Sequence, residues 1–180
     1  MADGDREKSG DWLLETRRFR VERVRHRHGD GTQRQREVVR HPGAVTILPL
    51  VDAGHVCLIR NHRVAVGQTL IELPAGTRDR PGEPSIETAR RELLEETGYR
   101  AGQLKPLHAF YLSPGILDER MALFLATELV AGPAEREPGE EIENLITPWE
   151  TALEMVVDGR IQDAKTIAGL LLYDHIRNHT

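Results

Sequence analysis

The segment from Gly82 to Tyr99 constrains the fold most, because it joins a helical pattern to a dense set of carboxylates. Ser85 is a good N-cap residue, since its hydroxyl can accept a hydrogen bond from a free helix N–H. Gly98 suits the position just past a helix, where the backbone turns left-handed. Four residues recur at helical spacing on one face: Ile86, Ala89, Leu93 and Thr97. The segment therefore predicts an amphipathic helix from about residue 85 to residue 97.

Three carboxylates gather on this predicted helix. Glu92 and Glu96 are four residues apart and stand above one another, and Glu95 lies alongside them. Their mutual repulsion is partly offset by Arg91, which can pair with Glu95 across one turn. A divalent cation offsets more of it, and hard cations such as Mg2+ prefer carboxylate and carbonyl oxygens. A solvated acidic face is the alternative for any charge run taken by itself.

The wider pattern favours the metal site. Glu83, seven further residues and then Arg-Glu-Leu-Leu-Glu-Glu-Thr-Gly-Tyr resemble the Nudix box, the loop-helix motif of Nudix hydrolases. The usual motif has five residues between its first Gly and Glu, whereas six separate Gly76 from Glu83 here. The resemblance implies Mg2+, with Mn2+ as an alternative, and cleavage of a phosphoanhydride. It also implies that Glu83, Arg91 and Gly98 brace the loop-helix geometry.

The strand residues before the box resemble one Nudix branch, the ADP-ribose pyrophosphatases. The similar segment runs from Ile59 through Glu72-Leu73-Pro74-Ala75-Gly76. The resemblance implies a metal site made of the Ala75 backbone carbonyl with Glu92, Glu95 and Glu96. It also implies that Arg63 and Glu72 contact the substrate, and a guanidinium fork is well shaped for phosphate. A surface salt bridge for Arg63 and an outward strand position for Glu72 are the alternatives.

A second loop extends this resemblance. Ser113-Pro114-Gly115 resembles the Ser-Pro-Gly loop of the same branch, and Pro114 follows Tyr99 by the characteristic fifteen residues. Glu119 matches the loop carboxylate that acts there as the catalytic base or as an extra metal ligand. Together with Glu92 and Glu96 it completes the catalytic set that the resemblance implies.

Length and composition fit one globular domain. The chain has 180 residues and a formal charge of −5, which argues against general nucleic-acid binding. The single Cys57 excludes an intrachain disulfide and lies in an apolar run, so we expect a buried thiol. No apolar run is long enough to span a membrane. We expect a cytoplasmic location and no membrane partner.

The N-terminal region differs from the rest. Residues 1–10 are predicted to be a disordered tail. Residues 11–41 predict an antiparallel β-hairpin, with one run from Trp12 to about Arg27 and a second from Gln33 to His41. A lone hairpin is marginal in water, so it must lean on the main domain or on a second subunit. In the resembling branch, such a small sheet commonly forms a domain-swapped homodimer.

Residues 42–180 are expected to form the Nudix domain, an α/β/α sandwich with a mixed sheet, of the α/β class. The resemblance implies hydrolysis of ADP-ribose to AMP and ribose 5-phosphate. Two alternatives stay open, a Nudix hydrolase for another nucleoside diphosphate sugar or nucleotide derivative, and a non-catalytic ADP-ribose sensor. Trp12 and Phe19 could stack on the adenine, with packing in the core as the equal alternative.

Overall fold

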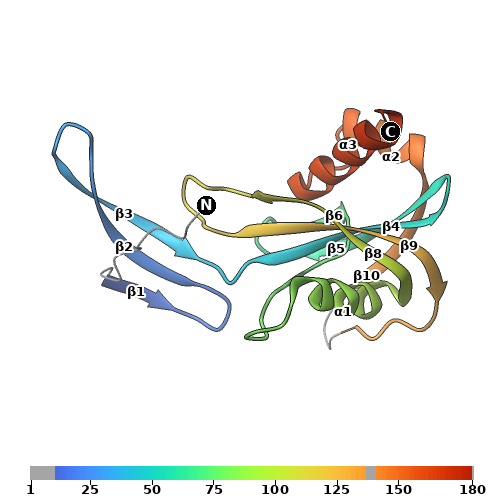
Figure 1. Cartoon of the computed structure of the whole chain (residues 1–180), viewed down its shortest axis with the longest axis horizontal. Coiled ribbons are helices and arrows are strands. Elements are labelled where there is room, and N and C mark those ends of the chain that lie inside the picture. Colours follow the sequence, from blue (N-terminus) through green and yellow to red (C-terminus); the bar gives the residue numbers. More distant parts are fainter. Residues whose placement is uncertain (1–10, 137–140, 180) are drawn as a thin grey trace.

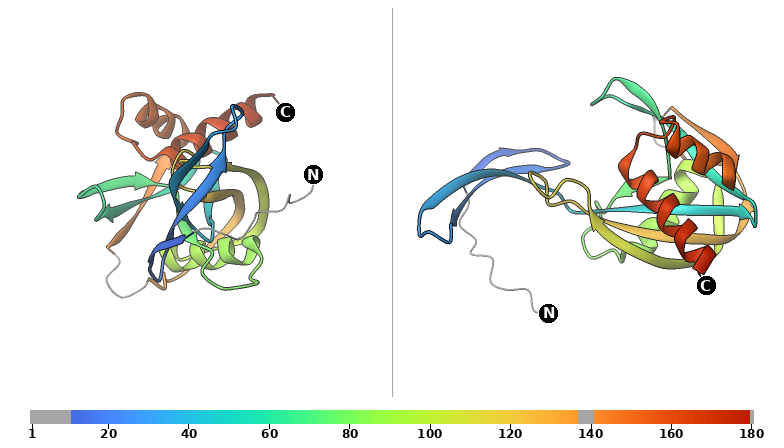
Figure 2. Two further views of the ribbon diagram at one scale, coloured as in Figure 1. Left: turned by 90° about the vertical axis from the view of Figure 1, so that its left-hand side faces the viewer. Right: turned by 90° about the horizontal axis from the view of Figure 1, so that it is seen from above.

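The computed structural model describes residues 11–136 and 141–179, and shows a body from which a small sheet projects (Figures 1 and 2). The predicted tail at residues 1–10 lies outside the described residues. The body contains one large sheet between helices. The small sheet, which we call the arm, consists of three N-terminal strands.

The large sheet is mixed, as predicted. Its strands are β4 (Ala44–Asp52), β5 (His55–Arg63), β6 (Gln68–Glu72), β7 (Ala75–Thr77), β8 (Tyr99–Tyr111), β9 (Arg120–Ala131) and β10 (Ile142–Pro148). The main path runs β10-β5-β4-β9-β8, and β6 and β7 pair with β5 and β4. Strands β4 and β9 are parallel, whereas the other pairs are antiparallel.

Helices cover both faces of this sheet. Helix α1 (Ser85–Thr97) lies on one face, and α2 (Trp149–Val157) and α3 (Ala164–His179) lie on the other (Figure 1). Strand β4 shows why, because its alternate residues are apolar on both sides. Val45 and Ile47 pack in the α1 core, and Leu48 packs in the core beneath α2 and α3. The predicted α/β/α sandwich is confirmed.

The box helix forms where expected, but its start differs from the prediction. Pro84 is the N-cap residue and no side chain caps the helix, while Ser85 is already its first helical residue. The N-cap prediction for Ser85 was therefore wrong, since a proline fixed in the extended conformation ends the loop one residue earlier. Gly98 has a φ of 79°, and its N–H donates to the Leu94 carbonyl, which confirms the predicted end of the helix.

The arm has one more strand than predicted. Its antiparallel strands are β1 (Asp11–Glu15), β2 (Arg20–Arg27) and β3 (Gln33–Arg40). The single run predicted from Trp12 to Arg27 is divided by a turn, in which the Thr16 hydroxyl donates to the Phe19 carbonyl. The sequence did not reveal this turn, because its residues, Thr16 to Phe19, include no Gly, Pro, Asn or Asp. The arm is largely exposed, and Trp12 is 53% accessible.

Two further expectations concern burial and membranes. Cys57 is fully buried, and this burial raises the pKa of its thiol to about 12, so the buried unreactive thiol is confirmed. None of the helices in the described part of the chain is long and apolar enough to cross a membrane.

Candidate active site

The acidic face of α1 borders a cavity of about 810 Å³ between the body and the arm. Its walls include Glu92, Glu95 and Glu96 from the helix, together with Ala75 from β7 and Arg63 from β5. The structure thus brings together most of the residues that the sequence predicted for metal and substrate. The other wall consists of arm residues, among them Trp12 and Phe19, so core packing of these two rings is excluded by their exposure.

Arg91 holds a group of carboxylates in place. Its Nη1 lies 2.7 Å from Glu92 Oε1 and 2.8 Å from Glu95 Oε2, and its Nη2 lies 3.3 Å from Asp79 and 3.6 Å from Glu83. The predicted pairing of Arg91 with Glu95 is present. We call these five residues the Arg91 cluster. One cation faces four carboxylates here, so the cluster keeps an excess of negative charge that a divalent cation would offset.

Glu83 links this cluster to the start of the helix. Its Oε2 accepts a hydrogen bond of 2.8 Å from the Thr88 hydroxyl, and its Oε1 lies 3.6 Å from Arg80. Thr88 itself is buried in the first turns of α1. Glu83 therefore ties the preceding loop to the helix, which is the bracing position that the resemblance implied.

Glu92 lies in a tight and partly dehydrated position. Burial, helped by the Glu95 charge and opposed by Arg91, raises the pKa of Glu92 to about 7. Gly76 explains the close approach of the backbone, because a Cβ at this position would lie 2.0 Å from Glu92 Cδ. A Cβ at position 76 would displace the Glu92 carboxylate from this position. Gly76 thus has a steric role despite the longer loop between it and Glu83.

Ala75 and Glu96 meet directly. The Ala75 N–H donates a hydrogen bond of 3.0 Å to Glu96 Oε2, and Glu96 is only 5% exposed. The β6–β7 connection is held by β4, since the Pro74 carbonyl accepts a hydrogen bond of 2.9 Å from the Ile47 N–H. The main chain at Ala75 is therefore fixed beside the acidic face of α1, and the role of its carbonyl as a metal ligand stays a prediction.

Arg63 reaches the same cavity from the opposite side. Its Nε donates to Glu72 Oε1 at 2.8 Å, and its Nη2 donates to Glu72 Oε2 at 2.6 Å. Glu72 is 1% exposed and also accepts a hydrogen bond from Lys165 Nζ. Burial raises the pKa of Glu72, but the bonds and charges of Arg63 and Lys165 outweigh it and lower the pKa overall. Glu72 therefore holds Arg63 from the buried side, and the Arg63 side chain lines the cavity.

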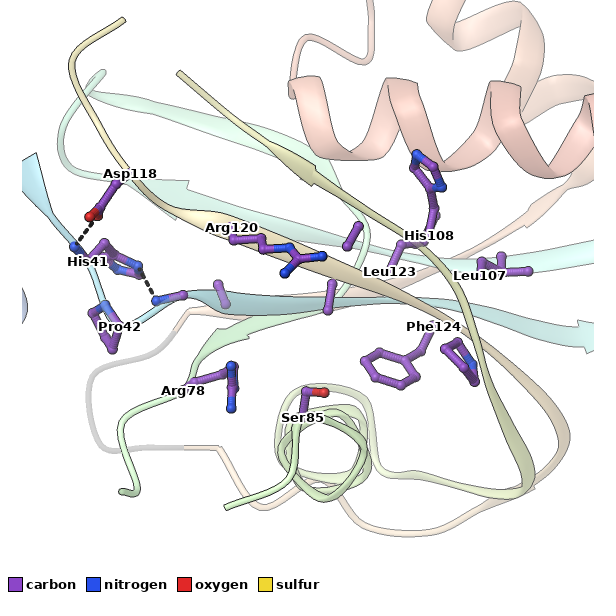
Figure 3. Close-up of a pocket in the computed structure, with 15 residues that line it drawn as sticks. His41, Pro42, Arg78, Ser85, Leu107, His108, Asp118, Arg120, Leu123 and Phe124 are labelled. Carbon is purple, nitrogen blue, oxygen red and sulfur yellow. Dashed lines mark hydrogen bonds between the residues drawn. The ribbon is translucent and has the colours of Figure 1, made fainter. Parts of the chain in front are cut away.

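Glu119 is not brought together with the box carboxylates. It lies on the loop between β8 and β9, and its Oε1 is 3.8 Å from His41 Nδ1. The neighbouring Asp118 accepts a hydrogen bond of 2.8 Å from the His41 N–H, as Figure 3 shows. This contact borders a second cavity of about 440 Å³, which shares His41, Pro42 and Arg78 with the larger one. The catalytic role of Glu119 stays a prediction.

The oxygen donors suit a hard cation, although they do not form a closed cage. Within residues 11–136 and 141–179, no three His, Cys, Asp or Glu side chains converge as a metal site. Arg91 lies against two of the carboxylates, and Ala75 bonds the third. Mg2+ is usually bound through one or two carboxylates together with waters and substrate phosphates. The open arrangement of Glu92, Glu95, Glu96 and the Ala75 main chain fits this mode.

Sequence reasoning missed Lys165 and the attachment of the arm. Lys165 lies two residues after Asp163, which caps the start of α3 by accepting a 3.0 Å hydrogen bond from the Thr166 N–H. No local pattern shows that a lysine in the first turn of α3 contacts a glutamate far away in the sequence. Arg40, which bonds Asp118 at 3.0 Å, was likewise hidden among the other arginines of the arm.

Comparisons with known proteins identify the family of this chain. A model of the NUDIX domain matches residues 40–170. The chain is 41% identical over 139 residues to an ADP-ribose pyrophosphatase of Bacillus subtilis (strain 168), covering 76% of this chain and 75% of that protein. It is 36% identical over 174 residues to an ADP-ribose pyrophosphatase of Mycobacterium tuberculosis (strain ATCC 25618 / H37Rv), covering 95% and 84%.

A solved structure extends the match to almost the whole chain, arm included. The crystal structure of an ADP compounds hydrolase superimposes with a TM-score of 0.82 at 26% sequence identity, covering 95% of this chain and 92% of that one. The domain match spans more than half of the chain, and it includes the box helix, Arg63 and Glu119. This chain therefore belongs to the Nudix family.

Proposed function

We propose that this protein hydrolyses the diphosphate of ADP-ribose, releasing AMP and ribose 5-phosphate. The observation that carries the proposal is a single cavity that joins Arg63 and Ala75 to Glu92, Glu95 and Glu96. Cationic and anionic groups face each other there, as a metal-bound diphosphate requires. The relatives named as ADP-ribose pyrophosphatases support ADP-ribose as the substrate.

Each side chain has a distinct part in this mechanism. Arg63 binds the substrate diphosphate with the edge of its guanidinium that Glu72 leaves open. Glu92, Glu95, Glu96 and the Ala75 carbonyl would hold Mg2+, with Mn2+ as the alternative. Such a cation neutralises charge on the phosphates and makes a bound water more acidic.

Glu119 is proposed as the base that positions the attacking water and takes its proton. The water oxygen forms a bond to one phosphorus, and the bond from that phosphorus to the bridging oxygen breaks. The bridging oxygen leaves with the other phosphate, so the two products are monophosphates. Asp79, Glu83 and Arg91 keep the carboxylates of α1 in register as a second layer of contacts.

The arm completes the cavity and supports a homodimer. Trp12, Leu13, Leu14 and Phe19 are exposed on it, although such side chains are usually covered. A second copy of the chain would cover them, and Trp12 and Phe19 would then offer rings for stacking on the adenine.

The cytoplasmic location of the protein also stays a prediction.

The test is turnover by the purified full-length protein with Mg2+ on a panel of ADP-ribose, ADP-glucose and GDP-mannose. ADP-ribose is expected to have the highest kcat/KM, with AMP and ribose 5-phosphate as products. Reaction in 18O water then identifies the attacked phosphorus, because the label appears in AMP or in ribose 5-phosphate. A higher kcat/KM for another sugar would overturn the choice of ADP-ribose. Tight binding of ADP-ribose without products would identify a sensor instead.

A further inference from the structure

Four charged residues, of which two are buried, form a cluster behind the substrate-binding side of the cavity. Lys165 Nζ contacts Glu72 and lies 3.0 Å from Asp163 Oδ1, while Glu72 pairs with Arg63. We call these four residues the Glu72 cluster. Two cations and two carboxylates balance within it. Lys165 is 6% exposed, and such burial of a lysine is costly unless the charge is paired.

The cluster has a buried end, formed by Glu72 and Lys165, and a partly exposed end, the Arg63 guanidinium. Glu72 uses both oxygens, Oε1 for Arg63 Nε and Oε2 for Arg63 Nη2 and Lys165 Nζ. Arg63 Nη1 takes no part in this pairing. The Arg63 side chain is 40% exposed, whereas that of Glu72 is 1% exposed, so the guanidinium is gripped from the buried side and lines the cavity with its remainder.

Lys165 is itself held in place by the packing of α3. The Thr166 hydroxyl accepts a hydrogen bond of 2.7 Å from the Leu73 N–H, the residue that follows Glu72. One turn later, Gly169 lies so close to Leu73 that a Cβ there would approach Leu73 Cδ1 to 2.7 Å. These contacts fix the first turn of α3 against the end of β6. The Lys165 side chain therefore extends from a rigid part of α3.

We propose that Lys165 is a positioning residue, which orients Arg63 for the substrate diphosphate through Glu72. This inference rests on the proposed function, because it assigns the anion at Arg63 to a diphosphate. It also assigns Glu72 to the support of Arg63 rather than to direct contact with the substrate. A buried ion pair adds little net stability over well-packed apolar side chains, so orientation is the property that the lysine contributes.

Loss of Lys165 should weaken substrate binding through Arg63. Without the ammonium, the Glu72 carboxylate and the attached guanidinium gain rotational freedom that the substrate must then remove. The ion pairs given for Lys165 in the described part of the chain are with Glu72 and Asp163, which are not among the proposed metal ligands, so the dependence on Mg2+ should change little.

The test is a double-mutant cycle in the full-length protein with wild type, Lys165→Met, Arg63→Ala and the double variant. Lys165→Met is expected to raise KM about tenfold, with kcat and the half-saturating Mg2+ concentration nearly unchanged. The same substitution in the Arg63→Ala background is expected to change KM less than twofold, since the lysine acts through the arginine. An equal change in both backgrounds would show a general structural role and overturn the inference.

Lys105→Met provides the matched control, because Lys105 is exposed on β8 and undergoes the same chemical change. Its KM should equal that of wild type. If circular dichroism shows that Lys165→Met does not fold, the cycle is run with Lys165→Gln, which keeps an N–H donor and removes the charge. The same two outcomes then decide the inference.

Failure of the proposed function is recognised separately. If wild type hydrolyses another nucleoside diphosphate sugar instead of ADP-ribose, the same cycle is measured with that substrate. If wild type hydrolyses none, the cycle is measured as the Kd of ADP-ribose by calorimetry. A wild type that neither hydrolyses a diphosphate sugar nor binds ADP-ribose overturns both the function and the inference.

Discussion

Two groups of charged residues border the cavity from opposite sides, and they differ in how their charge is balanced. The Arg91 cluster has four carboxylates for one arginine. The Glu72 cluster has two carboxylates for two cations. The first is incomplete without an added cation, whereas the second is complete within the protein. A group with excess negative charge and a balanced group that presents the Arg63 guanidinium thus face the space where we place a metal-bound diphosphate.

The two clusters also differ in burial. Glu72 is enclosed and keeps a lowered pKa because its partners outweigh burial. Glu92 is surrounded by further carboxylates, and burial raises its pKa to about 7. Burial alone therefore does not decide whether a carboxylate stays ionised, since the local ratio of cations to anions can reverse its effect. A metal ion would supply the positive charge beside Glu92 that Lys165 supplies beside Glu72.

The largest effect is expected for Glu96→Gln, which removes an anionic oxygen donor from the metal side of the cavity. Turnover of ADP-ribose should fall about a thousandfold, a rise of ~4 kcal/mol in the barrier. Steady-state kinetics at saturating Mg2+ measures this. Exposed Glu150→Gln on α2 is the control and should match wild type. Turnover within about tenfold of wild type would show that Glu96 is not a metal ligand.

A smaller effect concerns stability without metal. The folded pKa of Glu92 is about 7 and its ordinary value is 4.5, so the folded protein holds this proton more tightly than the unfolded chain. The contribution of Glu92 to the free energy of unfolding therefore decreases as pH rises from about 4.5 to 7, by about 3 kcal/mol. Urea unfolding in EDTA measures it. Glu92→Gln should lack this decrease, and identical pH profiles for the two proteins would contradict the assignment.

The smallest effect is expected for an exposed ion pair of the arm, formed by Arg23 and Glu37. Arg23 and Glu37 lie 3.1 Å apart, with side chains 39% and 56% exposed. Water and salt screen such a pair, so Arg23→Ala should change the free energy of unfolding by less than ~0.5 kcal/mol. Thermal unfolding at low and high salt measures this. A loss above ~1 kcal/mol would show that the arm depends on its charges as the body does.

The sequence predicted the parts of the site that are close together in the chain. Glu92, Glu95, Glu96 and Arg91 share one helix, so helical spacing alone places them on one face. Ala75 and Arg63 could be placed through the family resemblance. The Lys165 contact joins residues 93 positions apart, and no periodicity encodes such a contact. The position of Glu119 was equally beyond prediction, because a loop takes its path from what it contacts.

The attachment of that loop to the arm has a further consequence. Two backbone hydrogen bonds join them, from the Val39 N–H to the Ile116 carbonyl at 2.8 Å and from the Asp118 N–H to the Val39 carbonyl at 3.1 Å. Arg40 adds a side-chain bond to Asp118. Displacement of Glu119 toward the metal side must strain these bonds or carry β3 along. The position of the arm and the position of Glu119 are therefore coupled. Because such coupling is reciprocal, any contact that immobilises the arm also changes the free energy of moving Glu119 to the substrate.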